Sequence, residues 1–263
     1  MRASVFAAVL LLGLAATAAA ASPATKRPGE LIVALSLPAP ALQVGAVRGS
    51  EVVLARGLEV DVARAVARRL GLRLRLVQIG DAGRLLSPGR RGWDAALAQL
   101  VATPMRSRVS SFTTPYLRDD PVVLVRRGLK RPTSLAQLRT LVLCAERGRR
   151  AADALLTRVR PRTRPLLVTD LESVLRRVQT GACDAAVAEL SRLGPALDGR
   201  RDLFGGLAGR IETERAYAVA LERRSPLLPS VDAAVRALRA DGTFRRLTVA
   251  WLGIDVARLR ILR

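Results

Sequence analysis

Histidine is absent from this 263-residue chain, and cysteine, lysine and aromatic residues are scarce. Without histidine the chain has no Ser-His or Cys-His nucleophile pair, no histidine-based zinc site and no imidazole general base. Aromatic residues make up only 3% of the sequence, whereas proteins that bind single-stranded nucleic acids use aromatic side chains for stacking. These absences exclude several common enzyme classes and argue against a nucleic-acid partner.

The formal net charge of +22 is carried almost entirely by arginine, because only Lys26 and Lys130 of the 44 basic residues are lysine. The arginines are scattered over exposed positions of the expected helices, as at Arg64, Arg68 and Arg236. Nucleic-acid-binding modules usually cluster their charge on one surface. We therefore interpret the charge as a compositional bias, which would still attract anionic envelope surfaces at low salt.

The two cysteines, Cys144 and Cys183, are even in number, and a disulfide is one possible state in an exported chain. Cys144 is expected at the end of one strand and Cys183 at the start of another. In neighbouring parallel strands those ends lie far apart, whereas a disulfide requires Cα atoms within about 7 Å. The sequence therefore favours two buried thiols over a disulfide.

Residues 1–21 have the pattern of a secretory signal peptide. Arg2 precedes an apolar stretch at residues 5–16, and small residues around an Ala-x-Ala site follow it. We expect cleavage near Ala20 or Ala21. The alternative is an uncleaved anchor, but the leucine-rich part is shorter than the roughly 20 residues of a membrane-spanning helix. No cysteine follows for lipid attachment, so we expect a periplasmic or secreted protein without a lipid anchor.

Two stretches, residues 92–100 and 181–190, nearly repeat each other about one small domain apart. Each runs from a glycine through an aspartate and a short apolar run to a polar side chain, Gln99 or Glu189. Such apolar runs are typical of buried strands in α/β layers, where ligands bind at the carboxyl ends of strands. The repeat predicts two similar lobes with a ligand site between them. Chance similarity in a chain rich in alanine and leucine is the alternative.

Hydrophobic periodicity predicts an α/β fold with two βαβ lobes joined by two crossing segments. In the first lobe we expect a strand at 31–35, a helix from 57 to 70 and a strand at 72–76. In the second lobe we expect strands at 141–143 and 166–168 and helices at 149–158 and 171–179. The crossing segments are expected at 112–125 and 217–221, and the final helices at 228–239 and 243–252. The expected boundaries are 30–115 for the first lobe, 120–213 for the second, and 220–263 for the return to the first.

Several short motifs follow one another along the chain: GLEVDVA at 57–63, WDAA at 93–96, TPMR at 103–106, FTTPY at 112–116, PTSLAQL at 132–138, DAAV at 184–187, ADGTF at 240–244 and WLG at 251–253. Their order and spacing resemble those of the polar amino-acid substrate-binding proteins of ABC importers, which are family 3 extracellular solute-binding proteins of the type II periplasmic fold. The resemblance implies a monomer without a cofactor. Its two lobes would close on a small amino acid or organic acid and deliver it to an ABC permease.

The resemblance also implies roles for individual residues. Arg106 would hold the ligand carboxylate with its fork of donors, supplemented by backbone amides around Val101 and Thr103. Glu189 stands where the family has an acid that accepts the ligand ammonium group, and Gln99 is its counterpart in the first repeat. The alternatives are one more surface arginine at 106 and a solvated acid at the start of a helix at 189.

The expected site departs from the family pattern at several positions. Ser36 replaces a frequent acid, and Ala39 lies near the usual position of a stacking aromatic residue. The loop at 146–150 places Arg147 and Arg149 where glycine followed by hydroxyl residues is usual, and its alignment is ambiguous by about two residues. We include Ser36, Arg147 and Arg149 among the expected ligand-binding residues. The added positive charge suggests a ligand with an extra acidic group, and loss of binding is the other hypothesis.

Three classes of function follow from these observations. The leading interpretation is a non-enzymatic solute receptor that binds neither a metal nor nucleic acid. The second is an exported dehydratase on the same fold, acting on a prephenate- or arogenate-like acid with Glu189 and the arginine-rich loop as its acid and carboxylate clamp. The third is an envelope-binding protein that uses its charge alone, whose affinity would collapse with added salt.

Overall fold

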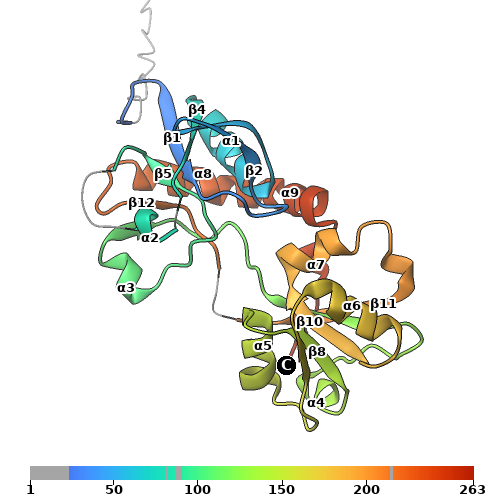
Figure 1. Ribbon diagram of the computed structural model, residues 1–263. Coiled ribbons are helices and arrows are strands. Elements are labelled where there is room, and N and C mark those ends of the chain that lie inside the picture. The colour runs from blue at the N-terminus through green and yellow to red at the C-terminus, as the bar shows by residue number, and fades with distance from the viewer. Residues whose placement is uncertain (1–23, 81, 87–90, 214–215) are drawn as a thin grey trace, which may run out of the picture.

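The chain folds into two α/β lobes connected by extended segments (Figure 1). The computed structural model describes residues 24–80, 82–86, 91–213 and 216–263. The expected signal peptide, residues 1–21, lies outside these described residues. Within the described part, no helix combines the length and the hydrophobicity that a membrane crossing needs.

The first lobe is built on a seven-stranded sheet with the order β2-β3-β4-β1-β5-β12-β6. Its strands are β1 (Glu30–Leu35), β2 (Val44–Arg48), β3 (Glu51–Arg56), β4 (Arg73–Gln78), β5 (Ala95–Ala96), β6 (Ser110–Phe112) and β12 (Ala220–Glu222). Its helices are α1 (Leu58–Arg69), α2 (Ala82–Leu85), α3 (Pro104–Ser107), α8 (Leu228–Ala240) and α9 (Thr243–Leu252). Helix α1 packs against both α8 and α9, so the C-terminal helices complete this lobe.

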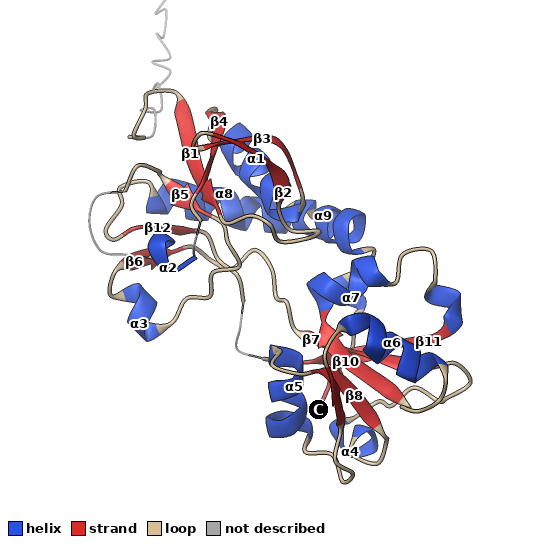
Figure 2. Ribbon diagram, viewed as in Figure 1, coloured by secondary structure: helices blue, strands red, loops and turns tan. Residues whose placement is uncertain are grey.

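The second lobe is built on a six-stranded sheet with the order β13-β11-β7-β10-β8-β9 (Figure 2). Its strands are β7 (Pro121–Arg126), β8 (Leu143–Glu146), β9 (Leu166–Val168), β10 (Ala185–Glu189), β11 (Phe204–Ile211) and β13 (Ile261–Leu262). Its helical segments are α4 (Leu135–Leu138), α5 (Arg150–Ala154), the π-helical turn η1 (Leu155–Val159), α6 (Leu171–Gln179), α7 (Leu190–Ala196) and the 3-10 turn η2 (Arg201–Leu203). A further 3-10 turn, η3 (Val256–Arg258), leads from α9 towards β13.

Five strands of each sheet share one arrangement, β4-β1-β5-β12-β6 in the first and β9-β8-β10-β7-β11 in the second, which confirms the prediction of two similar lobes. In the first lobe β1 pairs in parallel with β4 and β5, and in the second lobe β8 pairs in parallel with β9 and β10. A crossing strand then pairs antiparallel with each repeat strand, β12 with β5 and β7 with β10. The repeats recognised in the sequence therefore occupy equivalent places in the two sheets.

The aspartate of each repeat has a structural role at the start of the neighbouring parallel strand. Asp94 Oδ2 accepts a hydrogen bond from the backbone N–H of Ile32 at 2.8 Å. Asp184 Oδ2 accepts one from the backbone N–H of Val142 at 3.0 Å. Each carboxylate satisfies a backbone donor that the sheet leaves free, which fixes the strands in the same relative position in both lobes.

Strand β1 is buried on both faces, as its continuous apolar sequence predicts. Leu31, Val33 and Leu35 belong to the core cluster that includes α1. Ile32 and Ala34 belong to a second cluster on the opposite face of the sheet. The central strands of the sheet therefore place their carboxyl ends between two packed layers, where the following loops can form a site.

The chain enters α1 through Gly57, a position that only glycine fits. Its φ angle is 129°, and a Cβ atom there would lie 2.3 Å from the carbonyl oxygen of Leu42. The next residues, Leu58 and Glu59, donate backbone hydrogen bonds to the carbonyls of Ala41 and Leu42 at 2.9 Å. This contact fixes the first turn of α1 at the carboxyl edge of the sheet.

The C-terminal tail ends in the second lobe, whereas we expected residues 220–263 to belong wholly to the first. Strand β13 pairs in parallel with β11, with Ile261 opposite Arg210. The backbone N–H of Leu135 also donates to the carbonyl oxygen of Arg263 at 3.0 Å. A two-residue strand has too little periodicity to be recognised in a sequence, because its partner in the sheet determines it.

The lobes also make contact through α7 and α9 (Figure 1). Gly194 of α7 lies so close to α9 that an added Cβ would be 2.3 Å from the carbonyl oxygen of Leu252. Arg201 donates from Nη1 to the carbonyl oxygen of Gly253 at 2.7 Å. The crossing segments, the tail and this helix pair therefore all link the two lobes.

Cys144 and Cys183 form a disulfide, with their Cα atoms 6.0 Å apart, so the expectation of two thiols was wrong. That expectation placed Cys144 at the end of a strand over residues 141–143. Strand β8 instead begins at Leu143, and Cys144 lies opposite Ala186 of β10. Cys183 lies two residues before the start of β10, so both cysteines lie at the amino-terminal ends of these two parallel strands.

Replacing both cysteines with alanine is expected to lower the free energy of unfolding by about 3–4 kcal/mol, because the disulfide closes a loop with a sequence separation of 39 residues. Urea denaturation of the double variant and of the oxidised and reduced wild-type protein measures the effect. The reduced wild-type protein should match the double variant to within about 1 kcal/mol. A double variant as stable as the oxidised protein would contradict the prediction.

Candidate functional site

A cleft of about 660 Å³ lies between the lobes. The first lobe contributes the loop after β5 and the start of α3, and the second contributes α5 and η1 (Figure 1). Asp119 and Thr213, in the segments that connect the lobes, also line it. The cleft is thus formed by segments from both lobes and by the connections between them.

The wall from the first lobe is organised by a capped helical turn. Thr103 Oγ1 accepts the backbone N–H of Arg106 at 3.3 Å, and Pro104 occupies the first position of α3. The Arg106 side chain folds back and donates from Nη1 to the carbonyl oxygen of Val101 at 3.0 Å. Four of the expected residues, Gln99, Val101, Thr103 and Arg106, therefore line the cleft.

The wall from the second lobe is one face of the continuous helix formed by α5 and η1. The residues that line the cleft follow helical spacing, and they are Arg150, Asp153, Ala154, Thr157 and Arg158. The opposite face, including Ala151, Leu155 and Val159, is buried in the second lobe. The helix therefore presents two arginines, an aspartate and a threonine to the cleft and no aromatic side chain.

Arg150 is held at the cleft by a buried polar cluster. Its Nη2 donates to Tyr217 Oη and lies 3.5 Å from Asp119 Oδ2. Tyr217 in turn donates to Asp119 Oδ2 at 2.9 Å, and Ser191 donates to Asp119 through both its backbone N–H (2.8 Å) and its hydroxyl (2.7 Å). Asp119 and Tyr217 come from the two connections between the lobes, so the cluster joins both of them to the second lobe.

Burial has the largest effect on the pKa values of Asp119 and Tyr217. It raises the pKa of Asp119 above the ordinary aspartate value, although the hydrogen bonds from Ser191 and Tyr217 and the charge of Arg150 act in the opposite direction. Burial, and then the charge of Asp119, also raise the pKa of Tyr217, so its hydroxyl remains protonated at neutral pH. The Tyr217 hydroxyl is therefore available as the donor that Asp119 requires.

A second buried cluster supports Gln99 on the first lobe. Gln99 has a φ angle of 51°, which is unusual for a residue other than glycine. Its backbone N–H donates to Glu59 Oε1 at 2.9 Å, and its side-chain amide donates to Glu59 Oε2 at 2.5 Å. Gln43 and Tyr116 donate to the same fully buried carboxylate. Glu59 therefore fixes the loop that carries the first wall of the cleft.

Glu189 is the counterpart of Gln99, and it contacts the equivalent helix of its own lobe. Its Oε1 accepts the backbone N–H of Ala151, in the first turn of α5, at 3.0 Å. The side chain is buried and is not among the residues that line the cleft. In each lobe the polar residue at the end of the repeat strand thus makes a hydrogen bond to the first turn of a helix. Gln99 bonds to Glu59 of α1, and Glu189 bonds to Ala151 of α5.

Three other expected residues lie away from the cleft lining. Arg147 donates to the carbonyl oxygen of Leu167 at 3.2 Å, and Arg149 donates to Glu146 Oε1 at 2.9 Å. Ser36 donates its backbone N–H to a glutamine side chain at 3.0 Å. The arginine that enters the cleft is Arg150, because it is the first residue of α5. The sequence indicated that an arginine of the loop at 146–150 would contribute to the site. It could not indicate which one, because the start of a helix cannot be predicted to a single residue.

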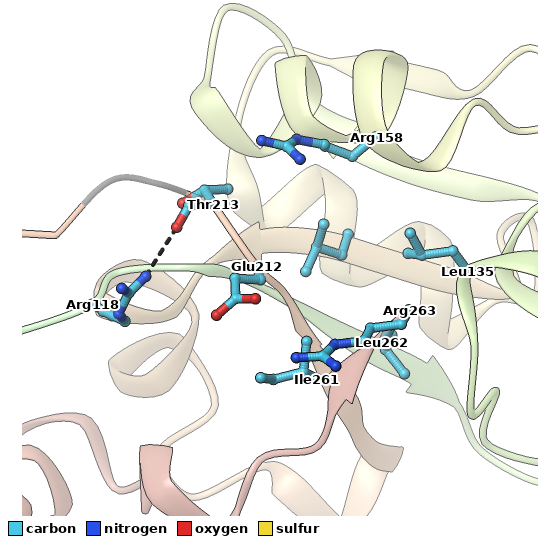
Figure 3. A pocket seen from close by; sticks show the side chains of 9 residues that line it. Arg118, Leu135, Arg158, Glu212, Thr213, Ile261, Leu262 and Arg263 are labelled. Atoms are coloured by element: carbon cyan, nitrogen blue, oxygen red, sulfur yellow. Dashed lines mark hydrogen bonds between the residues drawn. The ribbon is translucent and has the colours of Figure 1, made fainter.

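A second cavity of about 370 Å³ lies beside the end of β11, between α4 and the tail strand β13 (Figure 3). It shares Arg158 and Thr213 with the cleft. Arg118 donates to the carbonyl oxygen of Thr213 at 3.1 Å across its rim. Its other lining residues are the apolar Leu135, Ile211, Ile261 and Leu262 and the charged Glu212 and Arg263. Among the described residues, no group of acidic or cysteine side chains could hold a metal ion.

Comparison with known proteins relates the whole cleft-bearing region to one family. Residues 51–254 match the bacterial extracellular solute-binding proteins, family 3. The chain is 22% identical over 202 residues to the ABC transporter arginine-binding protein 1 of Escherichia coli, covering 74% of this chain and 81% of that protein. It is also 30% identical over 215 residues to the membrane-bound lytic murein transglycosylase F of Ectopseudomonas mendocina, covering 77% of this chain but only 43% of that protein.

Solved structures show the same fold. The unliganded, open L-cystine solute receptor of Neisseria gonorrhoeae superimposes with a TM-score of 0.72 at 17% identity, covering 87% of this chain and 94% of the receptor. The second substrate-binding domain of GlnP from Lactococcus lactis, also open, gives a TM-score of 0.71 at 18% identity and covers 89% of this chain and 99% of that domain. Both are two-lobe proteins of the type II periplasmic fold.

Proposed function

The chain belongs to the bacterial extracellular solute-binding proteins of family 3, and on this premise we propose that it captures an amino acid or a related small organic acid and delivers it to an ABC importer. The observation that carries the proposal is the position of Arg106. It lies on one wall of an interlobe cleft whose other wall is formed by α5 and η1. A ligand held by both walls would favour the closed arrangement of the lobes, because it makes contacts there that the open form cannot make.

The free donors of Arg106 suit a carboxylate. Its Nη1 contacts the carbonyl oxygen of Val101, while Nε and Nη2 donate to no other residue in the described part of the chain. Those two nitrogens form one edge of the planar guanidinium fork, which matches the two oxygens of a carboxylate. Glu189, the acceptor that the family resemblance implied for the ligand's ammonium group, is buried against α5 and does not line the cleft, so we assign it no contact with the ligand.

The proposed location follows from the family, whose members act outside the cytoplasm. We propose that residues 1–21 direct export and are removed, and that the mature protein acts as a monomer without a cofactor or a nucleic-acid partner. Its partner would be the membrane-bound permease of an importer. Binding that survives physiological salt would separate this function from attraction to the envelope by charge alone.

We further propose that the chain is not itself an enzyme. The lytic transglycosylase relative is matched over 43% of its length, so murein cleavage does not carry over to this chain. The dehydratase alternative requires a general acid at the reacting group, and Glu189 is buried against α5. Incubation with prephenate- or arogenate-like acids should return them unchanged, and turnover would favour the dehydratase.

The experiment that tests the proposed function is a thermal-shift screen of the mature protein against amino acids and small organic acids. A ligand present at a hundred times its Kd stabilises the folded protein by about 2.7 kcal/mol, so a true ligand raises the melting temperature by several degrees. Soluble murein peptides belong in the same screen, because the transglycosylase relative is 30% identical to this chain. A shift with murein peptides alone would favour a murein-derived ligand, and no shift with any compound would contradict solute capture.

A further inference from the structure

We propose that Arg150 forms a second anion-binding point in the cleft, and that the ligand carries a second acidic group in addition to its carboxylate at Arg106. This inference rests on the proposed function, since it concerns the same cleft. The ligand class it defines is the acidic amino acids and the short dicarboxylic acids. The contacts of Arg150 carry the argument.

Arg150 presents part of its guanidinium group to the cleft. Both of its contacts within the protein are made by Nη2, which donates to Tyr217 Oη and lies 3.5 Å from Asp119 Oδ2. Its Nε and Nη1 donate to no other described residue, and its side chain is 37% exposed to solvent. The guanidinium group also lies over the ring of Tyr217, with 5.5 Å between Cζ and the ring centroid. Arg150 is therefore oriented in advance, with donors left for an anion.

Asp119 and Glu189 are poorly placed to receive a cationic side chain instead, and the exposed Asp153 lies between Arg150 and Arg158 in the sequence of the helix that lines the cleft. Asp119 already accepts hydrogen bonds from Ser191 and Tyr217 and faces Arg150. Glu189 is buried and accepts the N–H of Ala151. A cationic ligand group would have to displace these internal partners and would then meet the charge of Arg150, which is unfavourable in a partly desolvated site.

The charges on the cleft surface favour an anionic ligand. Arg106, Arg150 and Arg158 contribute three positive charges, and Asp119 and Asp153 contribute two negative ones. Arg106 and Arg150 lie on opposite lobes, so a ligand with two separated carboxylates could contact both walls. An amino acid with a neutral side chain would leave the free donors of Arg150 without a partner when the cleft closes, and burying unpaired donors is costly.

Isothermal titration calorimetry with matched ligand pairs tests the proposal: glutamate against glutamine, and aspartate against asparagine. We expect the acidic member of at least one pair to bind the wild-type protein about tenfold more tightly or better, because a hydrogen bond to a charged group contributes that much. In Arg150→Gln this preference should fall to about twofold or less, while the affinity for the neutral member changes little. Arg164→Gln, an exposed arginine of the same lobe with the same change in charge, should retain the preference.

The outcomes separate the two proposals. If a neutral or cationic amino acid binds best and its binding depends on Arg106, the proposal of solute capture stands. The proposal that Arg150 binds a second acidic group of the ligand is then wrong. If Arg150→Gln weakens acidic and neutral ligands equally, Arg150 supports the cleft without selecting the ligand, which also overturns the inference. If no amino acid or dicarboxylic acid binds the wild-type protein, the proposed function fails. Circular dichroism melting of each variant establishes that it is folded.

Discussion

Arg106→Ala is expected to reduce the affinity for a carboxylate ligand by about a hundredfold or more, which removes the thermal shift at ordinary ligand concentrations. The substitution deletes the two guanidinium donors that have no partner among the described residues, together with the contact from Nη1 to the carbonyl oxygen of Val101. A ligand carboxylate would then lose its charged partner when the lobes close over it. Calorimetry with the ligand found in the screen gives the loss directly.

The matched control is Arg108→Ala, two residues further along the chain. Arg108 is exposed and follows α3, where its backbone rather than its side chain ends the helical turn. The two substitutions change the net charge equally, so any effect of long-range attraction would appear in both. Equal losses of affinity in the two variants would assign the effect to charge alone and would place the carboxylate clamp elsewhere.

Glu59→Ala is expected to lower the free energy of unfolding by about 3–5 kcal/mol at pH 5, because it leaves several buried donors without an acceptor. The carboxylate accepts hydrogen bonds from the side chains of Gln43, Gln99 and Tyr116 and from the backbone N–H of Gln99. Alanine supplies no acceptor and leaves a cavity beneath the cleft loop. Urea denaturation measures the loss, and Glu51→Ala, at an exposed position on β3, should change stability by about 0.5 kcal/mol or less.

The stability that Glu59 contributes should also depend on pH. Burial raises the pKa of Glu59 above the ordinary glutamate value despite its four hydrogen bonds. The folded protein therefore holds this proton more tightly than the unfolded chain does. The contribution is fully present below the unfolded pKa of about 4.3, and it is lost as pH rises through the higher folded pKa. The difference in stability between wild type and Glu59→Ala should thus shrink from pH 5 to pH 7.5, and a difference that grows would contradict this assignment.

The overall architecture could be predicted from the sequence because it depends on repeated local signals. Gln99 and Glu189 marked two equivalent strand ends, and the apolar runs before them fixed which segments lie in the sheets. The arginine of the TPMR motif was placed in the interlobe cleft by the family resemblance, and Thr103 and Pro104 specify the turn that carries it. These features are local in the sequence, so tertiary contacts did not alter them.

The missed features arise from contacts between distant segments. Asp119 and Tyr217 are buried together only because both connections between the lobes pass the start of α5. Arg150 was passed over in favour of Arg147 and Arg149, since one residue of uncertainty at the start of a helix changes which side chain faces the cleft. The disulfide between Cys144 and Cys183 depended on where β8 begins, which apolar periodicity does not define to a residue.

Small-angle X-ray scattering with and without the ligand identified in the screen tests the central claim most directly. If the lobes close on a solute held between Arg106 and the helix that begins at Arg150, saturating ligand should reduce the radius of gyration of the wild-type protein. The same concentration should leave Arg106→Ala in its unliganded form. A ligand that binds by calorimetry but leaves the wild-type scattering unchanged would show that capture does not use closure of the two lobes.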